Sequence, residues 1–242
     1  MTLEVRLFPC LSDNYGFLVR DVATGTVAAV DTPDAAAILA DMERSGWGRL
    51  DLILNTHWHP DHTQGNAALK AETGCEIVGP EEVRKAAPLD RVVRGGDTVM
   101  LGEAALEVSD APGHTLGHIV FRSPSDGLAF VGDVLFTLGC GRLFEGTPEQ
   151  MWDSLQTLAA WPDETVIWCA HEYTAANARF ALSLDDRPEM RARADEITAQ
   201  RERGEPTVPT TIGSEKAFNP FLRATDAADF AARRAAKDGF TG

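Results

Sequence analysis

The heptapeptide Thr56-His57-Trp58-His59-Pro60-Asp61-His62 concentrates three of the chain's six histidines around one aspartate. The apolar run Leu52-Ile53-Leu54-Asn55 before it predicts a buried strand, and an alanine-rich helix is expected after it. The histidines therefore fall in a turn at the carboxyl end of a strand, where open α/β sheets place their sites. The alternative is a polar surface loop. The agreement between motif and context favours a metal site instead.

Side-chain direction divides this motif into two pairs. His57 and His59 are two residues apart, so on an extended backbone they point to the same side and can bind one ion. Asp61 and His62 follow as the chain turns, and they can face a second point in space.

Composition and charge limit the classes of protein to consider. The chain has 242 residues, 44% of them hydrophobic and 24% charged, which is enough for a sizeable core in one domain or slightly more. Its formal net charge of −15 argues against a nucleic-acid backbone as the main partner.

The cysteines and the N-terminal sequence predict a cytoplasmic protein. Cys10, Cys75, Cys140 and Cys169 are widely spaced and form no CxxC pair, which favours reduced, mostly buried thiols. Residues 1–30 lack a basic start followed by a long apolar run, so we expect no signal peptide. No segment reaches the length of a membrane span.

Periodicity predicts a chain of strands and helices in which several strands are consecutive. Strands are expected at 3–8, 15–20, 27–31, 52–55, 76–78, 91–94, 97–101, 104–110, 119–122, 128–131 and 166–169. Helices are expected at 35–43, 66–72, 80–86, from a capping box at 147–150, within 174–203 with a break at 185–188, and at 225–237. The start of the first helix is assigned to Thr32-Pro33, residues 139–144 to a flexible loop, and residues 205–222 to a linker. The mixture predicts two sheets packed face to face with helices outside.

Three more candidate ligands stand at strand ends or in a tight turn. His114 follows the turn Pro112-Gly113, Asp133 follows the strand at 128–131, and His171 follows the strand at 166–169. Taken singly, each has an ordinary structural explanation, but a metal centre elsewhere in the chain favours ligation. Asp31 and His118 are instead assigned supporting or structural roles.

These side chains are too numerous for one tetrahedral ion and suit two ions that share a bridge. The predicted sets are His57, His59 and His114 for the first ion, Asp61, His62 and His171 for the second, and Asp133 between them. A ligand set of imidazoles and carboxylates without thiolates suits zinc, and it also permits iron or manganese. Metal binding lowers the pKa of water towards about 7, which makes hydroxide available as a nucleophile.

The motif HxHxDH is followed along the chain by a distant histidine, a strand-end aspartate and a final histidine. This order resembles the metallo-β-lactamase superfamily across residues 31–171. The resemblance implies an αββα sandwich with a dinuclear site at one edge. The rest of the chain resembles the glyoxalase II (hydroxyacylglutathione hydrolase) family, which adds a small helical C-terminal domain. We therefore expect a catalytic domain at 1–171 and a substrate-binding helical domain at 172–242.

The same resemblance assigns substrate contacts. It rests on Gly139-Cys140-Gly141-Arg142, His171-Glu172-Tyr173, Asn219-Pro220-Phe221-Leu222-Arg223 and Arg234-Ala235-Ala236-Lys237-Asp238. The implied contacts to glutathione come from Arg142, Phe144, Tyr173, Arg234 and Lys237. Arg234 and Lys237 are three apart on a helix and reach one side, although a solvated helix face has the same pattern.

Two of these positions depart from the family pattern. Phe144 stands where the family often has tyrosine, so a hydroxyl is lost. Arg142 stands where lysine is common, which keeps the charge but changes its geometry.

The resemblance implies a monomeric thioesterase that cleaves S-(2-hydroxyacyl)glutathione, chiefly S-lactoylglutathione, by attack of a metal-bridging hydroxide. Asp61 and Asp133 are the expected catalytic carboxylates, and the absence of a G-x-S-x-G pattern argues against an acylated serine. The alternatives are a mononuclear-iron persulfide dioxygenase of the same fold, a hydrolase of another thioester, and a non-catalytic metal-binding module. A nuclease would need an electropositive groove and usually an inserted domain, and neither is evident in the sequence.

Overall fold

The computed structural model describes residues 2–242 and divides the chain into two compact units. Unit 1 comprises Met1–Asp110 and Gly117–Gly132, and unit 2 comprises Ala111–Leu116 and Asp133–Gly242. This division does not follow the domain boundary expected between residues 171 and 172, because residues 133–171 group with the C-terminal helices. The boundary along the chain stays a prediction.

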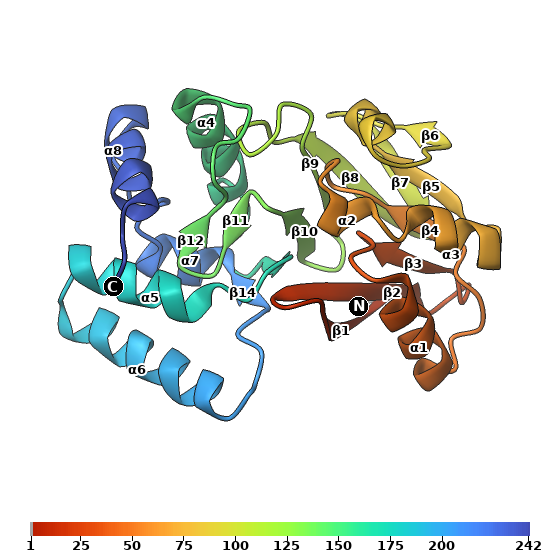
Figure 1. The fold of residues 1–242 in the computed structure, drawn as a ribbon, viewed down its shortest axis with the longest axis horizontal. Helices are drawn as coiled ribbons and strands as arrows, with labels where there is room; N and C mark the ends of the chain where they lie inside the picture. The colour runs from red at the N-terminus through yellow and green to blue at the C-terminus, as the bar shows by residue number, and fades with distance from the viewer. Residues whose placement is uncertain (1) are drawn as a thin grey trace. The chain divides into compact units, whose positions relative to one another are not determined.

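Unit 1 contains a mixed sheet with helices on one face (Figure 1). Its strands, in spatial order, are β1 (Leu3–Cys10), β2 (Asn14–Asp21), β3 (Val27–Val30), β4 (Leu52–Leu54), β5 (Glu76–Gly79) and β6 (Arg91–Val92). The first three run antiparallel, and β3 to β6 run parallel. The helical segments are α1 (Ala35–Ser45), α2 (Pro60–Thr63), α3 (Asn66–Thr73) and a 3₁₀ turn, η1 (Glu81–Lys85). Ile38 of α1 and Leu69 of α3 pack with Ile53 and Ile77 of the sheet.

A second sheet of unit 1 faces the first. Its strands within this unit are β7 (Thr98–Leu101), β8 (Ala104–Asp110), β9 (Ile119–Ser123) and β10 (Leu128–Gly132), each antiparallel to the next. The rings of Phe17 and Phe130, one from each sheet, have centroids 5.8 Å apart. The predicted pairing of two sheets is therefore confirmed within this unit.

The start of α1 corrects one prediction. Its N-cap is Asp34 rather than Thr32, and the Asp34 carboxylate accepts hydrogen bonds from the backbone amides of Ala36 and Ala37. Thr32 instead donates its hydroxyl to Asn66, at 2.6 Å. The helix ends before a left-handed residue at Gly46, as the sequence predicts.

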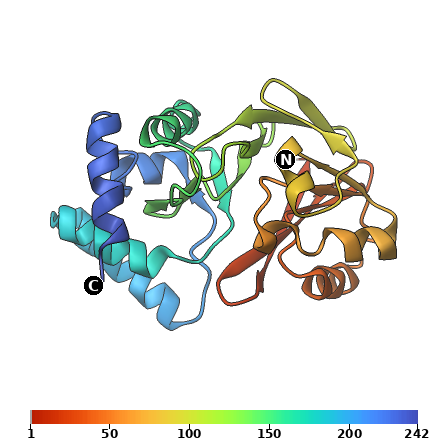
Figure 2. The same cartoon turned by 45° about the horizontal axis from the view of Figure 1, so that its top comes forward.

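Unit 2 combines short strands with most of the chain's long helices. The strands are β11 (Leu135–Phe136), β12 (Gly139–Cys140), β13 (Val166–Cys169) and β14 (Thr210–Thr211). The helices are α4 (Pro148–Ala159), α5 (Thr174–Leu184), α6 (Pro188–Glu202), α7 (Ile212–Phe218) and α8 (Ala227–Asp238). Figures 1 and 2 both show α5 and α6 side by side, and α4 packs against α8.

Two expectations for unit 2 hold only in part. The stretch 139–144 is not a loop throughout, because Gly139 and Cys140 are buried in β12 and pair with β11. Residues 205–222 are not only a linker, since they include β14 and α7. In both places a short element is stabilised by long-range contacts that local sequence does not reveal.

The core of unit 2 has an aromatic centre. Phe221 lies between Phe180 of α5 and Phe230 of α8, with ring centroids 5.9 Å from each. Phe240 closes against Phe180 at 5.4 Å and fixes the end of the chain on α5. No helix within residues 2–242 is long and apolar enough to cross a membrane.

Candidate metal centre and substrate pocket

Unit 1 carries two pairs of candidate ligands from the HxHxDH motif. The Nε2 atom of His57 lies 3.0 Å from Nδ1 of His59, and Nε2 of His62 lies 3.5 Å from Oδ2 of Asp61. Two ligand atoms on one tetrahedral zinc, at about 2.0–2.1 Å each, are about 3.3 Å apart. Both pairs therefore have the spacing of ligands that share an ion.

Asp31 fixes the orientation of this motif. Its carboxylate accepts hydrogen bonds from the amide and the hydroxyl of Thr56, both at 2.8 Å, and lies 2.8 Å from Nδ1 of His62. A proton on Nδ1 leaves the lone pair of Nε2 available for a metal, which is the usual role of a carboxylate behind a ligating histidine. Asp31 itself adopts a left-handed backbone, with φ 54°. The supporting role predicted for Asp31 agrees with these contacts.

His118, the other residue predicted to have a supporting role, also packs on this motif. The His118 ring is buried and stacks on His57, with centroids 4.6 Å apart and planes 20° from parallel. His118 therefore limits the rotation of the His57 ring.

Some supporting residues of unit 1 were not found from the sequence. Asn14 of β2 donates its amide to Oδ2 of Asp61 at 3.0 Å. Asn55 donates to the carbonyl of His62 at 2.9 Å, and Asn66 donates in turn to Asn55 at 2.7 Å. Only the strand-end position of Asn55 gave a local signal, because Asn14 approaches from β2 and Asn66 carries no pattern of its own at the start of α3.

Unit 2 gathers the remaining candidate ligands around Asp133. Its Oδ2 atom lies 3.3 Å from Nε2 of His114, and its Oδ1 atom lies 3.3 Å from Nε2 of His171. One carboxylate thus presents a different oxygen to each imidazole, as a bridging ligand would. The Nδ1 atom of His114 is 2.8 Å from the carbonyl oxygen of Arg142, so that nitrogen donates and Nε2 is the ligating atom.

Aromatic rings pack against His171. The ring of Tyr173 stacks on His171, with centroids 4.7 Å apart and planes 4° from parallel. Phe136 presents its edge to both rings, at 5.8 Å from His171 and 5.3 Å from Tyr173. The orientation of His171 is therefore set by packing.

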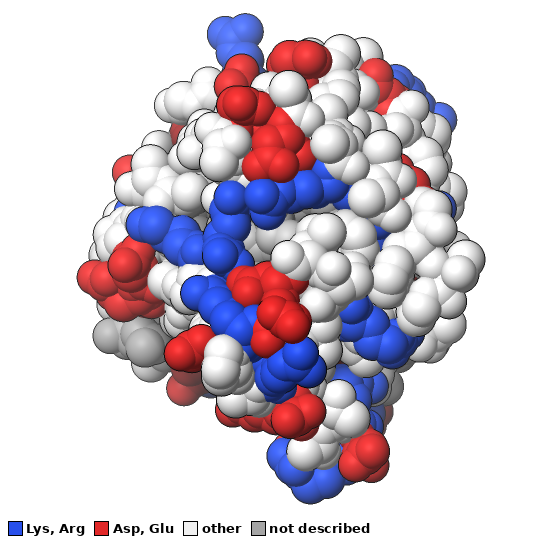
Figure 3. Space-filling model, turned by 90° about the vertical axis from the view of Figure 1, so that its left-hand side faces the viewer, with Lys and Arg blue, Asp and Glu red and all other residues white. Residues whose placement is uncertain are grey.

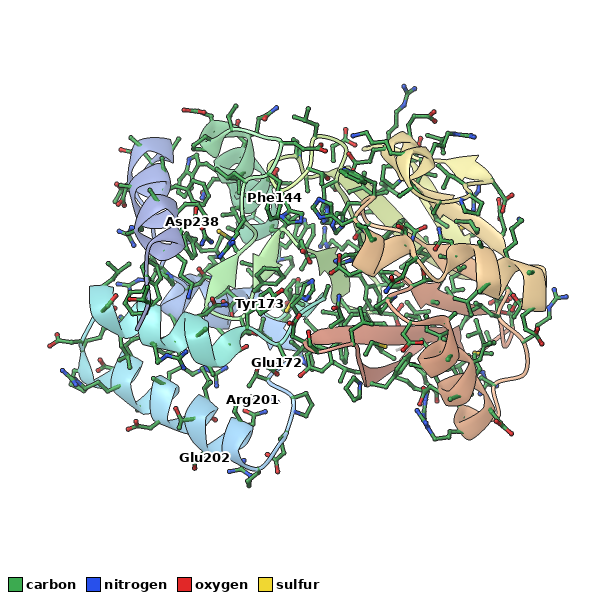
Figure 4. The ribbon with its side chains drawn as sticks, in the orientation of Figure 1. Phe144, Glu172, Tyr173, Arg201, Glu202 and Asp238 are labelled. Atoms are coloured by element: carbon green, nitrogen blue, oxygen red, sulfur yellow. The ribbon has the colours of Figure 1, made fainter. Side chains whose placement is uncertain are left out.

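A pocket of about 520 Å³ opens beside Asp133 and His114, entirely within unit 2. Its lining includes every predicted substrate residue: Arg142, Phe144, Tyr173, Arg234 and Lys237. Figure 4 labels Phe144, Tyr173 and Asp238, which line it from three separate segments. Figure 3 shows the face of unit 2 with α5, α6 and α8, where basic side chains, with acidic ones among them, border a hollow. In a chain of net charge −15, this local positive charge suits an anionic ligand.

The two cations of α8 differ in accessibility. Arg234 is 5% exposed; it donates to the carbonyl of Cys140 at 3.0 Å and to Asp238 at 2.8 Å. Lys237 donates to the carbonyl of Ala176 at 2.9 Å. Burial, followed by the charges of nearby arginines, lowers the pKa of Lys237 to about 8. The charge of Lys237 can therefore change with pH near 8. Arg234 also connects α8 to β12.

The pocket thiol is a poor nucleophile. Burial raises the pKa of Cys140 to about 11, and it raises that of Cys169, beside His171 in sequence, to about 12. All four cysteines are buried free thiols, as the sequence predicts. At neutral pH these thiols stay protonated, whereas the attacking species in thiol chemistry is the thiolate.

Comparison with known proteins adds a second line of evidence. Residues 24–171 match the model described as "Metallo-beta-lactamase superfamily", and residues 172–240 match "Hydroxyacylglutathione hydrolase C-terminus". The "Hydroxyacylglutathione hydrolase" of Erythrobacter litoralis is 52% identical over 251 residues, covering 98% of this chain and 100% of that protein.

Two solved structures resemble more than nine-tenths of the chain. ETHE1 from Myxococcus xanthus has a TM-score of 0.74 and 26% identity, covering 96% of this chain and 90% of that one. The BLEG-1 B3 metallo-beta-lactamase has a TM-score of 0.71 and 19% identity, covering 91% of this chain and 100% of that one. These similarities confirm the predicted fold class.

Proposed function

We propose that this chain, which belongs to the hydroxyacylglutathione hydrolase family of the metallo-β-lactamase superfamily, hydrolyses S-(2-hydroxyacyl)glutathione. The products are a 2-hydroxy acid, such as lactate, and glutathione. One observation carries the proposal: the pocket of unit 2 joins the ligand pair His114 and Asp133 to the cations Arg142 and Lys237. A thioester with an anionic tripeptide on its sulfur suits such a pocket.

Two divalent ions are proposed at the seven predicted ligands, with zinc as the expected metal and iron or manganese as alternatives. The ligand pairs described above have the donor types and the spacing for this. Bound ions supply a water molecule of lowered pKa and a positive charge that polarises the thioester carbonyl. Asp61 and Asp133, the predicted catalytic carboxylates, would act as ligands of these ions.

The protein's own side chains orient the substrate. Lys237 and Arg142 face the pocket and pair with carboxylates of the glutathione part, while Arg234 adds positive potential from its buried position. Tyr173 and Phe144 supply aromatic surface on either side. The carbonyl of Arg142 keeps the proton of His114 on Nδ1 during this process.

Three further points complete the proposal. Residues 1–171 form the catalytic module and residues 172–242 the substrate-binding module, since the two family matches meet between residues 171 and 172. The protein is proposed to act as a monomer. It acts in the cytoplasm, where its buried thiols remain reduced.

The direct test is hydrolysis of S-lactoylglutathione by the purified protein, with metal analysis of the same sample. Lactate and free thiol are expected in equal amounts. A chelator should abolish turnover, and zinc, iron or manganese should restore it. No turnover by fully metal-loaded protein would contradict the proposal, as would oxygen uptake with glutathione persulfide in place of hydrolysis.

A matched pair of variants tests recognition of the glutathione part. Lys237→Ala should raise KM and leave kcat nearly unchanged, because a remote carboxylate contact is similar in the ground and transition states. Arg233→Ala is the control: it removes a cation from the same helix whose guanidinium pairs with Asp229 at 2.9 Å, outside the pocket lining. Equal effects of the two variants would place recognition elsewhere.

A further inference from the structure

The hairpin of β11 and β12 is held by side chains from α7 and its C-terminal end. Asn219 donates its side-chain amide to two hairpin carbonyls, those of Phe136 at 3.1 Å and Gly139 at 2.9 Å. Glu215 accepts the backbone amide of Leu138 at 2.8 Å. The same carboxylate oxygen lies 2.9 Å from the Asn219 amide nitrogen, whose two hydrogens are shared among these three acceptors, and this contact joins the two side chains into one polar unit.

This polar unit lies in the interior of the protein. Glu215 and Asn219 are both 0% exposed, and Thr210 donates its hydroxyl to the second oxygen of Glu215 at 2.6 Å. Burial raises the pKa of Glu215. Both oxygens of Glu215 accept hydrogen bonds, so an apolar residue at this position would deprive the buried Leu138 amide of this acceptor.

The turn that this unit holds has an uncommon backbone. Leu138 has φ 57°, a left-handed conformation that is unfavourable for a leucine. Its side chain is buried against Ala178 and Met190. Asn177 adds a contact from α5 by donating to the carbonyl of Thr137 at 3.1 Å. The turn thus depends on these surrounding contacts for its shape.

The open end of the hairpin leads directly to the candidate metal ligands. Asp133 immediately precedes Val134, whose carbonyl accepts the amide of Gly141 at 3.3 Å. Arg142 follows at once, and its carbonyl receives Nδ1 of His114 at 2.8 Å. At Gly141 a Cβ atom would lie 2.0 Å from the carbonyl oxygen of Asp133, so the two strand ends are in close contact. A shift of the turn therefore changes the positions of Asp133 and His114.

We propose that Glu215 and Asn219 are positioning residues for the reaction: they fix the hairpin that places Asp133, the His114-binding carbonyl and the pocket wall formed by Phe136. This inference rests on the proposed function for its effect on turnover. Its structural part, the dependence of the hairpin on these two side chains, does not. Neither residue belongs to the predicted ligand set or lines the pocket.

The test compares Asn219→Ala and Glu215→Gln with a core control. Asn219→Ala removes both carbonyl contacts, and it should lower kcat by about tenfold or more, because small misplacements of catalytic groups have large effects on rate. Amide hydrogen exchange in residues 134–141 should become faster in the same variant. Glu215→Gln keeps an oxygen for the Leu138 amide and should remain within about threefold of the unaltered protein, a change of less than 1 kcal/mol.

Controls separate positioning from stability. Leu158→Ala, a buried substitution in α4, should lower Tm without faster exchange in the hairpin and with little change in kcat below its unfolding temperature. Lys216→Ala removes the exposed Lys216–Asp163 ion pair from α7 and should change neither quantity. If Asn219→Ala does not fold, Asn219→Ser replaces it, since a serine hydroxyl is too short to reach both carbonyls.

Two results of these measurements would overturn the inference. Unchanged hairpin exchange in the Asn219 variant, or a loss of kcat no larger than that of Leu158→Ala at equal Tm, overturns the inference. If the unaltered protein does not hydrolyse the thioester, the proposed function fails. Hydrogen exchange, together with the Kd of S-hexylglutathione for each variant, then still decides whether the hairpin depends on Glu215 and Asn219.

Discussion

The pKa of Lys237 predicts how glutathione binding depends on pH. Burial is the main cause of the lowering to about 8, and the charges of Arg234, Arg179 and Arg142 add to it. A substrate carboxylate beside the ammonium group reverses this effect by stabilising the charged form. Binding therefore requires the protonated lysine, and affinity should fall as pH rises through about 8.

The size of the effect follows from the fraction of Lys237 that is charged. With a pKa of about 8, that fraction is about 90% at pH 7 and about 10% at pH 9. The Kd of the ligand should then rise about tenfold between these pH values, which corresponds to about 1.4 kcal/mol. A lysine with the ordinary value of 10.5 would stay charged by about 95% or more and would give almost no change.

Destabilisation of the fold by the titration of Lys237 does not explain such a fall in affinity. The folded pKa of Lys237 lies below its unfolded value, so the unfolded chain binds more protons between pH 8 and 10.5. The contribution of this group to stability therefore increases with pH across that window. Binding and stability should change in opposite directions.

The assay is the Kd of the unreactive ligand S-hexylglutathione at pH 7, 8 and 9. Lys237→Arg is the matched control, because its guanidinium stays charged throughout and reports the titration of the ligand's own amine. The unaltered protein should lose about tenfold more affinity than this variant over the range. Parallel curves for the two proteins would refute the assignment of the pH dependence to Lys237.

Other predictions concern the metal site, specificity and the nucleophile. Asp31→Ala should weaken metal retention by about 10–100-fold, and Asp133→Ala should weaken it further, as measured by metal analysis after dialysis. Phe144→Tyr should lower KM by roughly 2–10-fold if the added hydroxyl makes one hydrogen bond of about 0.5–1.5 kcal/mol, and an unchanged KM would show that it finds no partner. Replacing Cys140 and Cys169 together by alanine should leave kcat within about tenfold, and mass spectrometry after a rapid quench should detect no acylated protein.

Local sequence signals predicted most of the fold. The two-residue period of the strands and the capping signals gave the strands of unit 1 and the break between α5 and α6, because these patterns depend only on neighbouring residues. The capping box at Thr147 and Gln150 is present as predicted. Short elements such as β12, β14 and α7 were missed, since their few residues carry too little periodic signal.

Sequence alone also gave the candidate ligands, because each stands in the motif, in a tight turn or at the end of an apolar strand. Apart from Asp31 and His118, it did not give the groups that hold them. Asn14 reaches Asp61, and the carbonyl of Arg142 receives His114, across sequence separations of 47 and 28 residues.

Residue type and spacing along the chain are local properties that can be read before folding. The path that brings Asn14, Glu215 and Asn219 to their partners is fixed only when the strands and helices pack. Their hydrogen bonds are set by that packing and leave no periodic signal in the sequence. The chemistry of the site was therefore determined by the sequence, and its support was decided by the tertiary structure.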